Sequence, residues 1–218
     1  MTAPAQPEIV LGVTGSIGAY KAAEIVRRLR DHGCVVRCVM TAEAQQFLTP
    51  LTLQALSGQP VSTELFDRSD IEIAHTTLAD RTHLVLIAPA TANVIAKLAH
   101  GFADDALTCL VLATTAPVLL APAMNVHMYR HPMTQQNLKQ VRRLGYHVVG
   151  PDIGQLACGY EAIGHLADPE QIVQAALRLA RPPSKKTSAP IVDGSHAPAV
   201  ARRGATPRRR APRARARR

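Results

Sequence analysis

Short apolar runs alternate with amphipathic stretches along most of the chain. Runs rich in Val, Ile and Leu, bounded by glycine or polar residues, are typical of buried strands in parallel sheets. Five such runs predict strands at Glu8–Gly15, Cys34–Met40, Leu84–Ala88, Val118–Ala121 and His147–Val149. The stretches between them place apolar residues three and four positions apart, which is the spacing of one helix face. Strands that alternate with helices in this way predict an α/β fold with a doubly wound, mainly parallel sheet.

The predicted helices follow the strands in order. They are expected at Ile17–Arg30, in two short pieces within Ala42–Ser57, and at Ala74–Asp80, Thr91–Ala99, Asp104–Ala113, Pro132–Leu144 and Pro169–Ala180. The second short piece begins at Pro50, a residue favoured in the first turn of a helix. Residues Pro151–His165 are expected to form a loop. Because ligands of doubly wound sheets bind beyond the carboxyl ends of the strands, the residues that follow the strands are the first candidates for a site.

The positive charge of the chain is confined to its C-terminal segment. The sequence holds 25 Lys and Arg against 16 Asp and Glu, a formal net charge of +9. Residues 181–218 contain 12 of the basic residues and one of the acidic residues, which leaves 13 basic and 15 acidic residues in 1–180. After Ala180 the composition also changes to Pro, Ala, Ser and Arg without a hydrophobic period. We therefore expect a folded domain over residues 1–180 and a disordered basic tail over residues 181–218.

Composition argues against several classes of protein. Hydrophobic residues make up 47% of the chain, enough for a sizeable core, whereas aromatic residues make up only 3%. So few aromatic rings cannot form the stacking platforms that bind single-stranded nucleic acid. No apolar run reaches the roughly 18 residues of a membrane span, and residues 1–7 lack the basic and apolar regions of a signal peptide. We expect a cytoplasmic protein that does not bind membranes, whose four cysteines form neither a disulfide framework nor a zinc site.

Polar residues and glycines follow three of the predicted strands. Gly15 and Ser16 lie between the first strand and the first helix, where backbone N–H groups and a hydroxyl can bind an anion, although a plain tight turn is an equal alternative. Thr41 follows the second strand. The segment Pro89-Ala90-Thr91-Ala92-Asn93 follows the third. Its hydroxyl and amide suit the polar edge of a flavin or a ribityl chain, but Thr91 is equally suited to be a helix N-cap.

Three further segments carry groups that could take part in catalysis. His75 lies in a loop-to-helix region; histidine is the natural base near neutral pH, although a lone histidine is more often structural. Asn125 lies between Met124 and Met128 after the fourth strand, where its amide could donate to a carboxylate or simply form a turn. Cys158 lies in a loop with glycines on both sides. Its thiol could be exposed and available as a proton donor, or the cysteine could be incidental.

These motifs occur together, and in this order, in one known family. The chain resembles the homo-oligomeric flavin-containing cysteine decarboxylases, and within them the phosphopantothenoylcysteine decarboxylases, over roughly residues 7–180. The resemblance rests on Gly15-Ser16-Ile17-Gly18-Ala19-Tyr20-Lys21, His75, Pro89-Ala90-Thr91-Ala92-Asn93, Pro122-x-Met124-Asn125-x-x-Met128 and Ala157-Cys158-Gly159. Each motif alone is weak evidence for the family, whereas the occurrence of all of them in this order is specific to it.

The resemblance implies a Rossmann-like flavoprotein that binds FMN and decarboxylates 4′-phosphopantothenoylcysteine to 4′-phosphopantetheine in coenzyme A synthesis. FMN would oxidise the cysteine thiol and so turn the neighbouring carboxylate into a good leaving group. By the same resemblance, His75 is the base, Asn125 holds the substrate carboxylate and Cys158 supplies a proton to the enethiol. The implied cofactor contacts are Gly15, Ser16, Ile17, Thr41, Pro89, Ala90, Thr91 and Asn93, and the further substrate contacts are Met124 and Ala157. A homotrimer, sometimes assembled into a dodecamer, is implied, with FMN near a subunit interface.

Two features depart from the family's pattern. Where the family usually carries Gly-x-Gly-Arg-Met after the cysteine, this chain has Ala162-Ile163-Gly164-His165-Leu166, a change that bears on substrate affinity and on loop closure. Many bacterial relatives continue into a ligase domain that joins cysteine to phosphopantothenate, and residues 181–218 cannot form it. A separate ligase chain, a truncated sequence and an out-of-frame end are the alternatives; sequencing the gene past this point would distinguish them.

Three other functions compete with this interpretation. A decarboxylase acting on the C-terminal cysteine of a peptide would use the same FMN chemistry, and the loop around Cys158 is closer to the pantothenoyl branch. A non-catalytic, flavin-binding regulatory subunit is a second alternative, against which the joint presence of His75, Asn125 and Cys158 argues. The basic tail could bind nucleic acid through its arginines, although a solvated tail without function is favoured.

Overall fold

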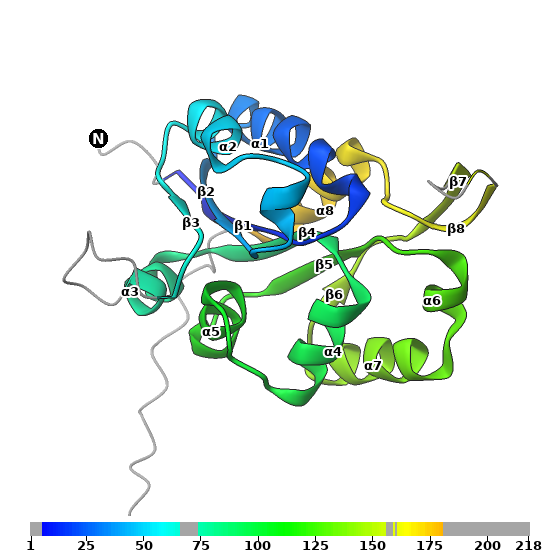
Figure 1. Cartoon of the computed structure of the whole chain (residues 1–218). Helices are drawn as coiled ribbons and strands as arrows, with labels where there is room; N and C mark the ends of the chain where they lie inside the picture. The colour runs from blue at the N-terminus through cyan, green and yellow to red at the C-terminus, as the bar shows by residue number, and fades with distance from the viewer. Residues whose placement is uncertain (1–5, 66–73, 156–158, 160, 181–218) are drawn as a thin grey trace, which may run out of the picture. The chain divides into compact units, whose positions relative to one another are not determined.

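A six-stranded parallel sheet forms the centre of the protein in a computed structural model, which describes residues 6–65, 74–155, 159 and 161–180. The strands are β1 (Glu8–Val13), β2 (Val35–Met40), β3 (Val61–Ser62), β4 (Leu84–Ala90), β5 (Val118–Pro122) and β6 (His147–Val148). Their order in the sheet is β3-β2-β1-β4-β5-β6, and every neighbouring pair is parallel. The chain therefore winds from β1 to one edge, returns to β4 beside β1, and continues to the other edge (Figure 1). The predicted doubly wound, mainly parallel sheet is confirmed.

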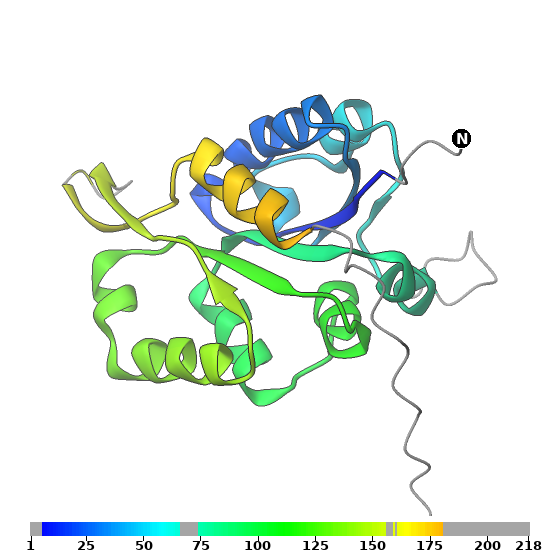
Figure 2. The same ribbon diagram turned by 180° about the vertical axis from the view of Figure 1, so that it is seen from behind.

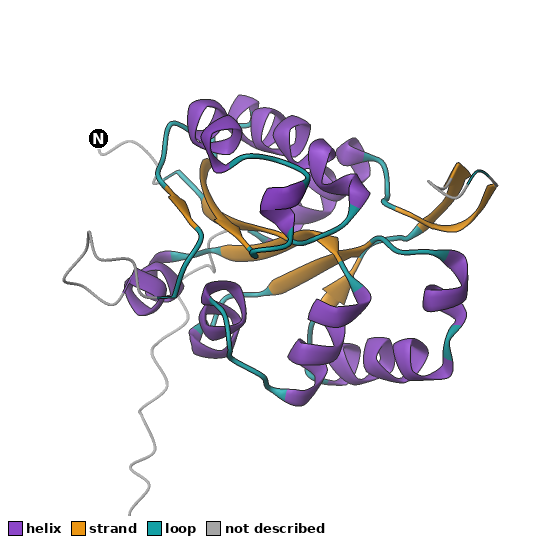
Figure 3. Ribbon diagram, viewed as in Figure 1, coloured by secondary structure: helices purple, strands orange, loops and turns teal. Residues whose placement is uncertain are grey.

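Helices cover both faces of this sheet. One layer contains α1 (Ala22–Asp31), α2 (Pro50–Ser57) and α8 (Pro169–Leu179), and the other contains α4 (Ala92–His100), α5 (Ala106–Ala113) and α7 (Pro132–Arg143) (Figures 2 and 3). Successive residues of β1 alternate between the two cores: Ile9 packs in the core with α1 and α8, and Val10 in the core with α4 and α5. Burial on both faces explains why the central strands are continuous apolar runs instead of alternating patterns.

Short-range capping interactions set the ends of the helices that lead into and out of the site. Thr91 Oγ1 accepts a hydrogen bond from Val94 N–H at 3.3 Å, which makes Thr91 the N-cap of α4. Gly101 ends α4 with a φ of 71°, in the left-handed region that favours glycine. Asp105 Oδ1 accepts from Thr108 N–H at 2.8 Å and Thr108 Oγ1 accepts from Asp105 N–H at 3.2 Å. This capping box makes α5 begin at Ala106, two residues after the predicted start.

The structure differs from the sequence prediction at four places along the chain. The predicted loop Pro151–His165 is wrong in part, because β7 (Asp152–Gln155) and β8 (Glu161–His165) form an antiparallel hairpin. The helix predicted from Ile17 begins as a 3-10 turn, η1 (Ile17–Lys21), before α1. The edge strand β3 and the short helix α6 (Val126–Arg130) were not predicted. The hairpin, β3 and α6 are short or lack an apolar period, so the pattern of the sequence gives them no signal. For η1, a helix was predicted and only its 3-10 geometry was not.

Two further predictions concern the helix at Ala74–Asp80 and the basic tail. Helix α3 (Ala74–Arg81) confirms the helix expected at Ala74–Asp80 and packs beside α5. The basic tail, residues 181–218, lies outside the described residues. Among the helices of the described part, none is long and apolar enough to cross a membrane.

Candidate functional site

The turn after β1 places a hydroxyl and backbone N–H groups at the carboxyl edge of the sheet. Ser16 has extended backbone angles and caps η1, since its Oγ accepts from Gly18 N–H at 3.3 Å. The Ser16 N–H donates to Thr14 O at 2.8 Å and the Ser16 carbonyl accepts from Ala19 N–H at 2.8 Å, which fixes the turn. The start of a helical turn fixed in this way presents its positive dipole end, beside the Ser16 hydroxyl, to an anion.

Glycine at position 15 allows this turn to lie against the segment that follows β2. A Cβ atom at Gly15 would lie 2.4 Å from Glu43 Cβ and 3.2 Å from the Glu43 carbonyl carbon. The neighbouring Thr41 is buried, and its Oγ1 accepts from Ala44 N–H at 3.3 Å at the start of η2 (Ala44–Gln46). The close approach of the two turns forms one wall of a cavity, described below, that a side chain at position 15 would narrow.

Thr14 joins the ends of β1 and β4. Its side chain is fully buried, and its Oγ1 donates to Pro89 O at 2.7 Å and accepts from Thr91 N–H at 3.1 Å. The segment after β4 is thereby fixed to the segment after β1. As Ala123 N–H also donates to Ala90 O at 3.1 Å, the end of β5 is tied to the end of β4.

The turn after β5 brings Met124 and Asn125 to the same edge. Asn125 caps α6, with its Oδ1 accepting from His127 N–H at 2.8 Å. Met124 N–H donates to Gly164 O at 3.0 Å, so the β7–β8 hairpin lies against this turn. Gly164 has a φ of 130°, and a Cβ there would lie 2.2 Å from Met124 O. Glycine is therefore required where the hairpin contacts the turn.

Two adjoining cavities open at this edge of the sheet. The first has a volume of about 300 Å³, and polar groups from the ends of β1, β2 and β4 line it together with Met124 and Met128. Its polar or glycine lining residues are Gly15, Ser16, Thr41, Glu43, Thr91 and Asn93. The second has a volume of about 460 Å³ and lies between η1, the β5–α6 turn and the hairpin, with Ser16, Ala123 and Met124 common to both.

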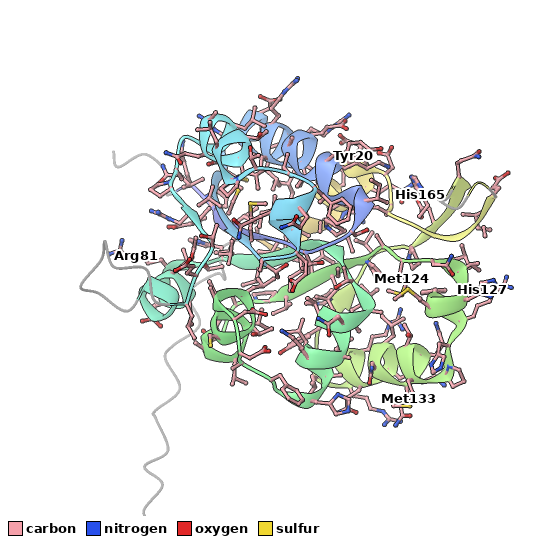
Figure 4. All side chains as sticks on the ribbon, in the orientation of Figure 1. Tyr20, Arg81, Met124, His127, Met133 and His165 are labelled. Carbon is pink, nitrogen blue, oxygen red and sulfur yellow. The ribbon has the colours of Figure 1, made fainter. Side chains whose placement is uncertain are left out.

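The second cavity has mostly apolar walls and a few polar groups. Ile17, Tyr20 and Leu166 contribute apolar surface, and Asn125 and Gln155 contribute amides. Lys21 Nζ and His165 Nε2, 3.0 Å apart, form a polar pair in the same cavity. Tyr20, Met124 and His165 lie on one side of the domain, far from Arg81 (Figure 4).

Most of the predicted site residues converge on these cavities, although not all of them line one. Gly15, Ser16, Thr41, Thr91 and Asn93 line the smaller cavity, and Ile17, Met124 and Asn125 line the larger. Pro89 and Ala90 are buried in β4 behind them and line neither, so they support the site without facing it. Ala157 and Cys158 lie outside the described residues.

His75 is not placed beside these residues by the fold of one chain. It belongs to α3, of which the backbone but not the His75 side chain is described. Helix α3 lies at the opposite side of the domain from α6 and the hairpin in both views (Figures 1 and 2). The predicted base and the predicted carboxylate-binding amide are therefore on elements that one chain keeps apart.

Four ionisable residues that line the cavities were not predicted as site residues. Glu43 follows β2 just after Thr41, so the rule that selected Thr41 could also have selected it. Tyr20 and Lys21 were part of the first motif but were given no role. His165 lies in a segment predicted as a loop, and only the hairpin brings it to Lys21.

Among the residues that the structure describes, the ionisable groups with displaced pKa values lie outside the two cavities. Burial raises the pKa of the Cys38 thiol to about 12, and it also raises the pKa of Cys34. Both cysteines are core residues, with 1% and 5% of their surface exposed, so they behave as small apolar side chains. No group of three His, Cys, Asp or Glu within the described ranges could hold a metal ion.

A parallel sheet with hydroxyl- and amide-lined cavities at its carboxyl edge defines an α/β protein of the nucleotide- or flavin-binding class. The chain belongs to the flavoprotein family, since the profile of the family named Flavoprotein matches residues 2–181.

Named relatives agree with this assignment. The coenzyme A biosynthesis bifunctional protein CoaBC of Vibrio cholerae is 48% identical over 174 residues, which are 79% of this chain and 44% of the relative. The solved structure of the FMN-dependent cysteine decarboxylase SpaF is 36% identical, with a TM-score of 0.71 over 82% of this chain and 99% of that one. A PPC decarboxylase variant complexed with pantothenoylaminoethenethiol is 29% identical, with a TM-score of 0.70 over 80% and 98%. This chain thus spans less than half the length of the curated relative it matches.

Proposed function

We propose that this chain is an FMN-dependent decarboxylase that converts 4′-phosphopantothenoylcysteine to 4′-phosphopantetheine in coenzyme A synthesis. The observation that carries the proposal is the convergence of the residues after β1, β2, β4 and β5 on two adjoining cavities. The similarity to CoaBC and to a PPC decarboxylase supports the choice of substrate. The similarity to SpaF supports FMN and a cysteine carboxylate as the reacting group.

The residues present fit FMN. Gly15 leaves space beside Glu43 that a Cβ would fill, and the adjoining cavity presents the hydroxyls of Ser16, Thr41 and Thr91 and the amide of Asn93. Hydroxyl and backbone N–H groups at a helix start suit a phosphate, and the remaining polar groups suit a ribityl chain. When bound, FMN supplies the two-electron oxidation and reduction that the cysteine carbon needs.

The chain's own residues would orient the substrate beside the cofactor. Because His127 N–H holds Asn125 Oδ1 at 2.8 Å, the Asn125 side chain has a fixed orientation in which Nδ2 is the hydrogen-bond donor. Such a donor suits the substrate carboxylate before it leaves as carbon dioxide. Met124 and Leu166 give the same region apolar walls. Cys158, outside the described residues, is proposed as the proton donor to the enethiol.

We further propose that the active unit is a homotrimer in which His75 reaches the site of a neighbouring copy. The support is the position of α3, on the side of the domain opposite α6 and Asn125. A second copy could bring its own α3 to the cavities, whereas the α3 of the same chain cannot reach them without refolding. A cyclic trimer would form three such shared sites.

A turnover assay on the purified protein tests the function. We expect a yellow protein that releases carbon dioxide and 4′-phosphopantetheine from 4′-phosphopantothenoylcysteine. His75→Asn should abolish turnover, and His100→Asn, at an exposed helix end, should retain it. A yellow but inert protein would instead direct the assay to a peptide ending in cysteine, and inertness there too would favour a regulatory subunit. A colourless protein that does not take up added FMN contradicts the cofactor assignment.

Mixing two inactive variants tests the shared site. His75→Asn and Asn125→Asp should each be inactive alone, and subunit exchange between them should restore up to about a quarter of wild-type activity if each site draws one residue from each of two chains. Mass measurement of the complex in solution gives the number of copies. No restoration after confirmed subunit exchange would place both residues in one chain and contradict the proposal.

A further inference from the structure

The Lys21–His165 pair has a defined hydrogen-bonding arrangement. His165 Nδ1 is 3.0 Å from Gln155 O, and a carbonyl oxygen can only accept, so Nδ1 carries a proton. In the neutral ring Nε2 is then an acceptor, and it faces Lys21 Nζ at 3.0 Å. The hairpin thus fixes the ring, and the ring fixes the ammonium group at the wall of the 460 Å³ cavity.

The Lys21 ammonium has hydrogen-bonding capacity beyond this contact. It carries three N–H donors, and His165 accepts one of them. The ion pairs found among the described residues involve Arg28, Arg37 and Lys97, and no carboxylate there lies within 4 Å of Lys21. Glu24, which shares a neighbouring cavity with Lys21, already pairs with Arg28 at 2.7 Å. The cavity therefore presents a positive charge that the described carboxylates do not neutralise.

We propose that Lys21 and His165 bind the phosphate group of the substrate, an inference that rests on the proposed function. The same cavity carries Asn125, so one ligand with a carboxylate and a phosphate could meet both polar groups. Apolar side chains also line this cavity, among them Ile17, Tyr20 and Leu166, and they suit the aliphatic pantothenoyl arm. A phosphomonoester dianion can accept charge-assisted hydrogen bonds from the N–H groups of the ammonium that His165 does not hold.

Ligand binding tests this subsite separately from turnover. The probes are 4′-phosphopantothenate and pantothenate, titrated calorimetrically into the FMN-loaded wild-type protein. We expect the phosphorylated compound to bind at least about tenfold more tightly, the usual gain from charge-assisted hydrogen bonds. The ratio of the two affinities should approach one in Lys21→Met, and it should persist in Lys139→Met, which removes an exposed lysine of α7.

A second variant covers the case in which Lys21→Met does not fold. His165→Leu removes the ring that holds Lys21 and should also reduce the affinity ratio. Equal affinities of the two compounds for the wild-type protein, or an unchanged ratio in both variants, would overturn the proposal. The proposal would also be overturned if Lys21→Met lost its bound FMN but still bound 4′-phosphopantothenate more tightly than pantothenate. In that case the Lys21–His165 pair would serve the cofactor.

The binding measurement distinguishes failure of the phosphate subsite from failure of the proposed function. If the wild-type protein prefers the phosphorylated compound but does not decarboxylate 4′-phosphopantothenoylcysteine, the phosphate subsite stands and the reaction assignment fails. If it decarboxylates that substrate but binds both compounds equally, the reaction stands and the subsite is excluded.

Discussion

The Thr14 hydroxyl donates a 2.7 Å hydrogen bond to the carbonyl oxygen of Pro89, 75 positions later in the sequence. The same oxygen of Thr14 accepts from Thr91 N–H at 3.1 Å. One buried side chain therefore satisfies a backbone acceptor and a backbone donor just before α4. In this way it sets the relative position of the turns that carry Ser16 and Thr91.

Replacement of Thr14 by valine should destabilise the protein and loosen the site. Thr14→Val keeps the shape but leaves Pro89 O and Thr91 N–H without a partner, which costs about 1–3 kcal/mol for each buried group left unsatisfied. Urea unfolding should report this loss, and the affinity for FMN should fall with it. Thr14→Ser restores the hydroxyl and should recover most of the stability. Wild-type stability in Thr14→Val together with a loss in Thr14→Ser would mean that the methyl group, not the hydroxyl, matters.

Gly164 should be essential for the position of the hairpin. An alanine Cβ would lie 2.2 Å from Met124 O, and the φ of 130° is unfavourable for alanine as well. We expect Gly164→Ala to displace β8 and break the bond from Met124 N–H to Gly164 O. A strain of about 1–3 kcal/mol corresponds to roughly 5- to 150-fold faster hydrogen exchange at the Met124 amide.

Gly58→Ala is the matched control for that substitution. Gly58 also has a positive φ, of 68°, but a Cβ there would have no atom within 4 Å. It should cost about 1 kcal/mol of backbone strain and leave the exchange of the Met124 amide unchanged. Similar effects of the two substitutions on that amide would show that the Met124 contact is unimportant.

The sequence predicts the central sheet well because burial on both faces gives β1, β2, β4 and β5 long apolar runs. It does not predict the hairpin, since β7 and β8 are held by backbone pairing and by the contact of Gly164 with Met124. Their side chains carry little apolar pattern, and Ile153 is 70% exposed.

The sequence likewise predicts one part of the candidate site and not another. The position of Ser16, Thr41, Thr91 and Asn125 at strand ends follows from the topology of a doubly wound sheet. The Lys21–His165 contact spans 144 positions and depends on the register of the hairpin, for which the sequence carries no local signal.

Gly15→Ala should weaken cofactor binding through a steric effect. The new Cβ would lie 2.4 Å from Glu43 Cβ, so the turn after β2 must move and change the 300 Å³ cavity. Overpacking of this kind costs about 1–3 kcal/mol, and we expect about tenfold weaker FMN binding in a fluorescence titration. The double variant Gly15→Ala/Glu43→Gly removes the shortest contact and should recover part of the affinity. If the double variant binds FMN more weakly still, the Glu43 side chain itself contributes to binding.

Cys38 should make the stability of the protein fall at high pH. Burial raises its pKa from the ordinary 9.0 to about 12, so between these values the folded protein keeps a proton that the unfolded chain has lost. The stabilisation is complete below pH 9 and is lost as the pH rises toward 12. In that window each such thiol lowers the free energy of unfolding by up to about 1.4 kcal/mol per pH unit. Burial raises the pKa of Cys34 and of Tyr146 as well, which adds to the slope in the same direction.

Urea unfolding between pH 8 and pH 11 separates this titration from simple loss of packing. Cys38→Ala should reduce the slope of stability against pH, whatever its effect on stability at pH 7. Val36→Ala removes apolar volume from the same strand and the same core without removing an ionisable group, so it should lower stability at every pH and keep the wild-type slope. A wild-type slope in Cys38→Ala would mean that Cys38 ionises in the folded protein as readily as in the unfolded chain. The core around β2 would then have to admit water, in conflict with the 1% exposure of Cys38.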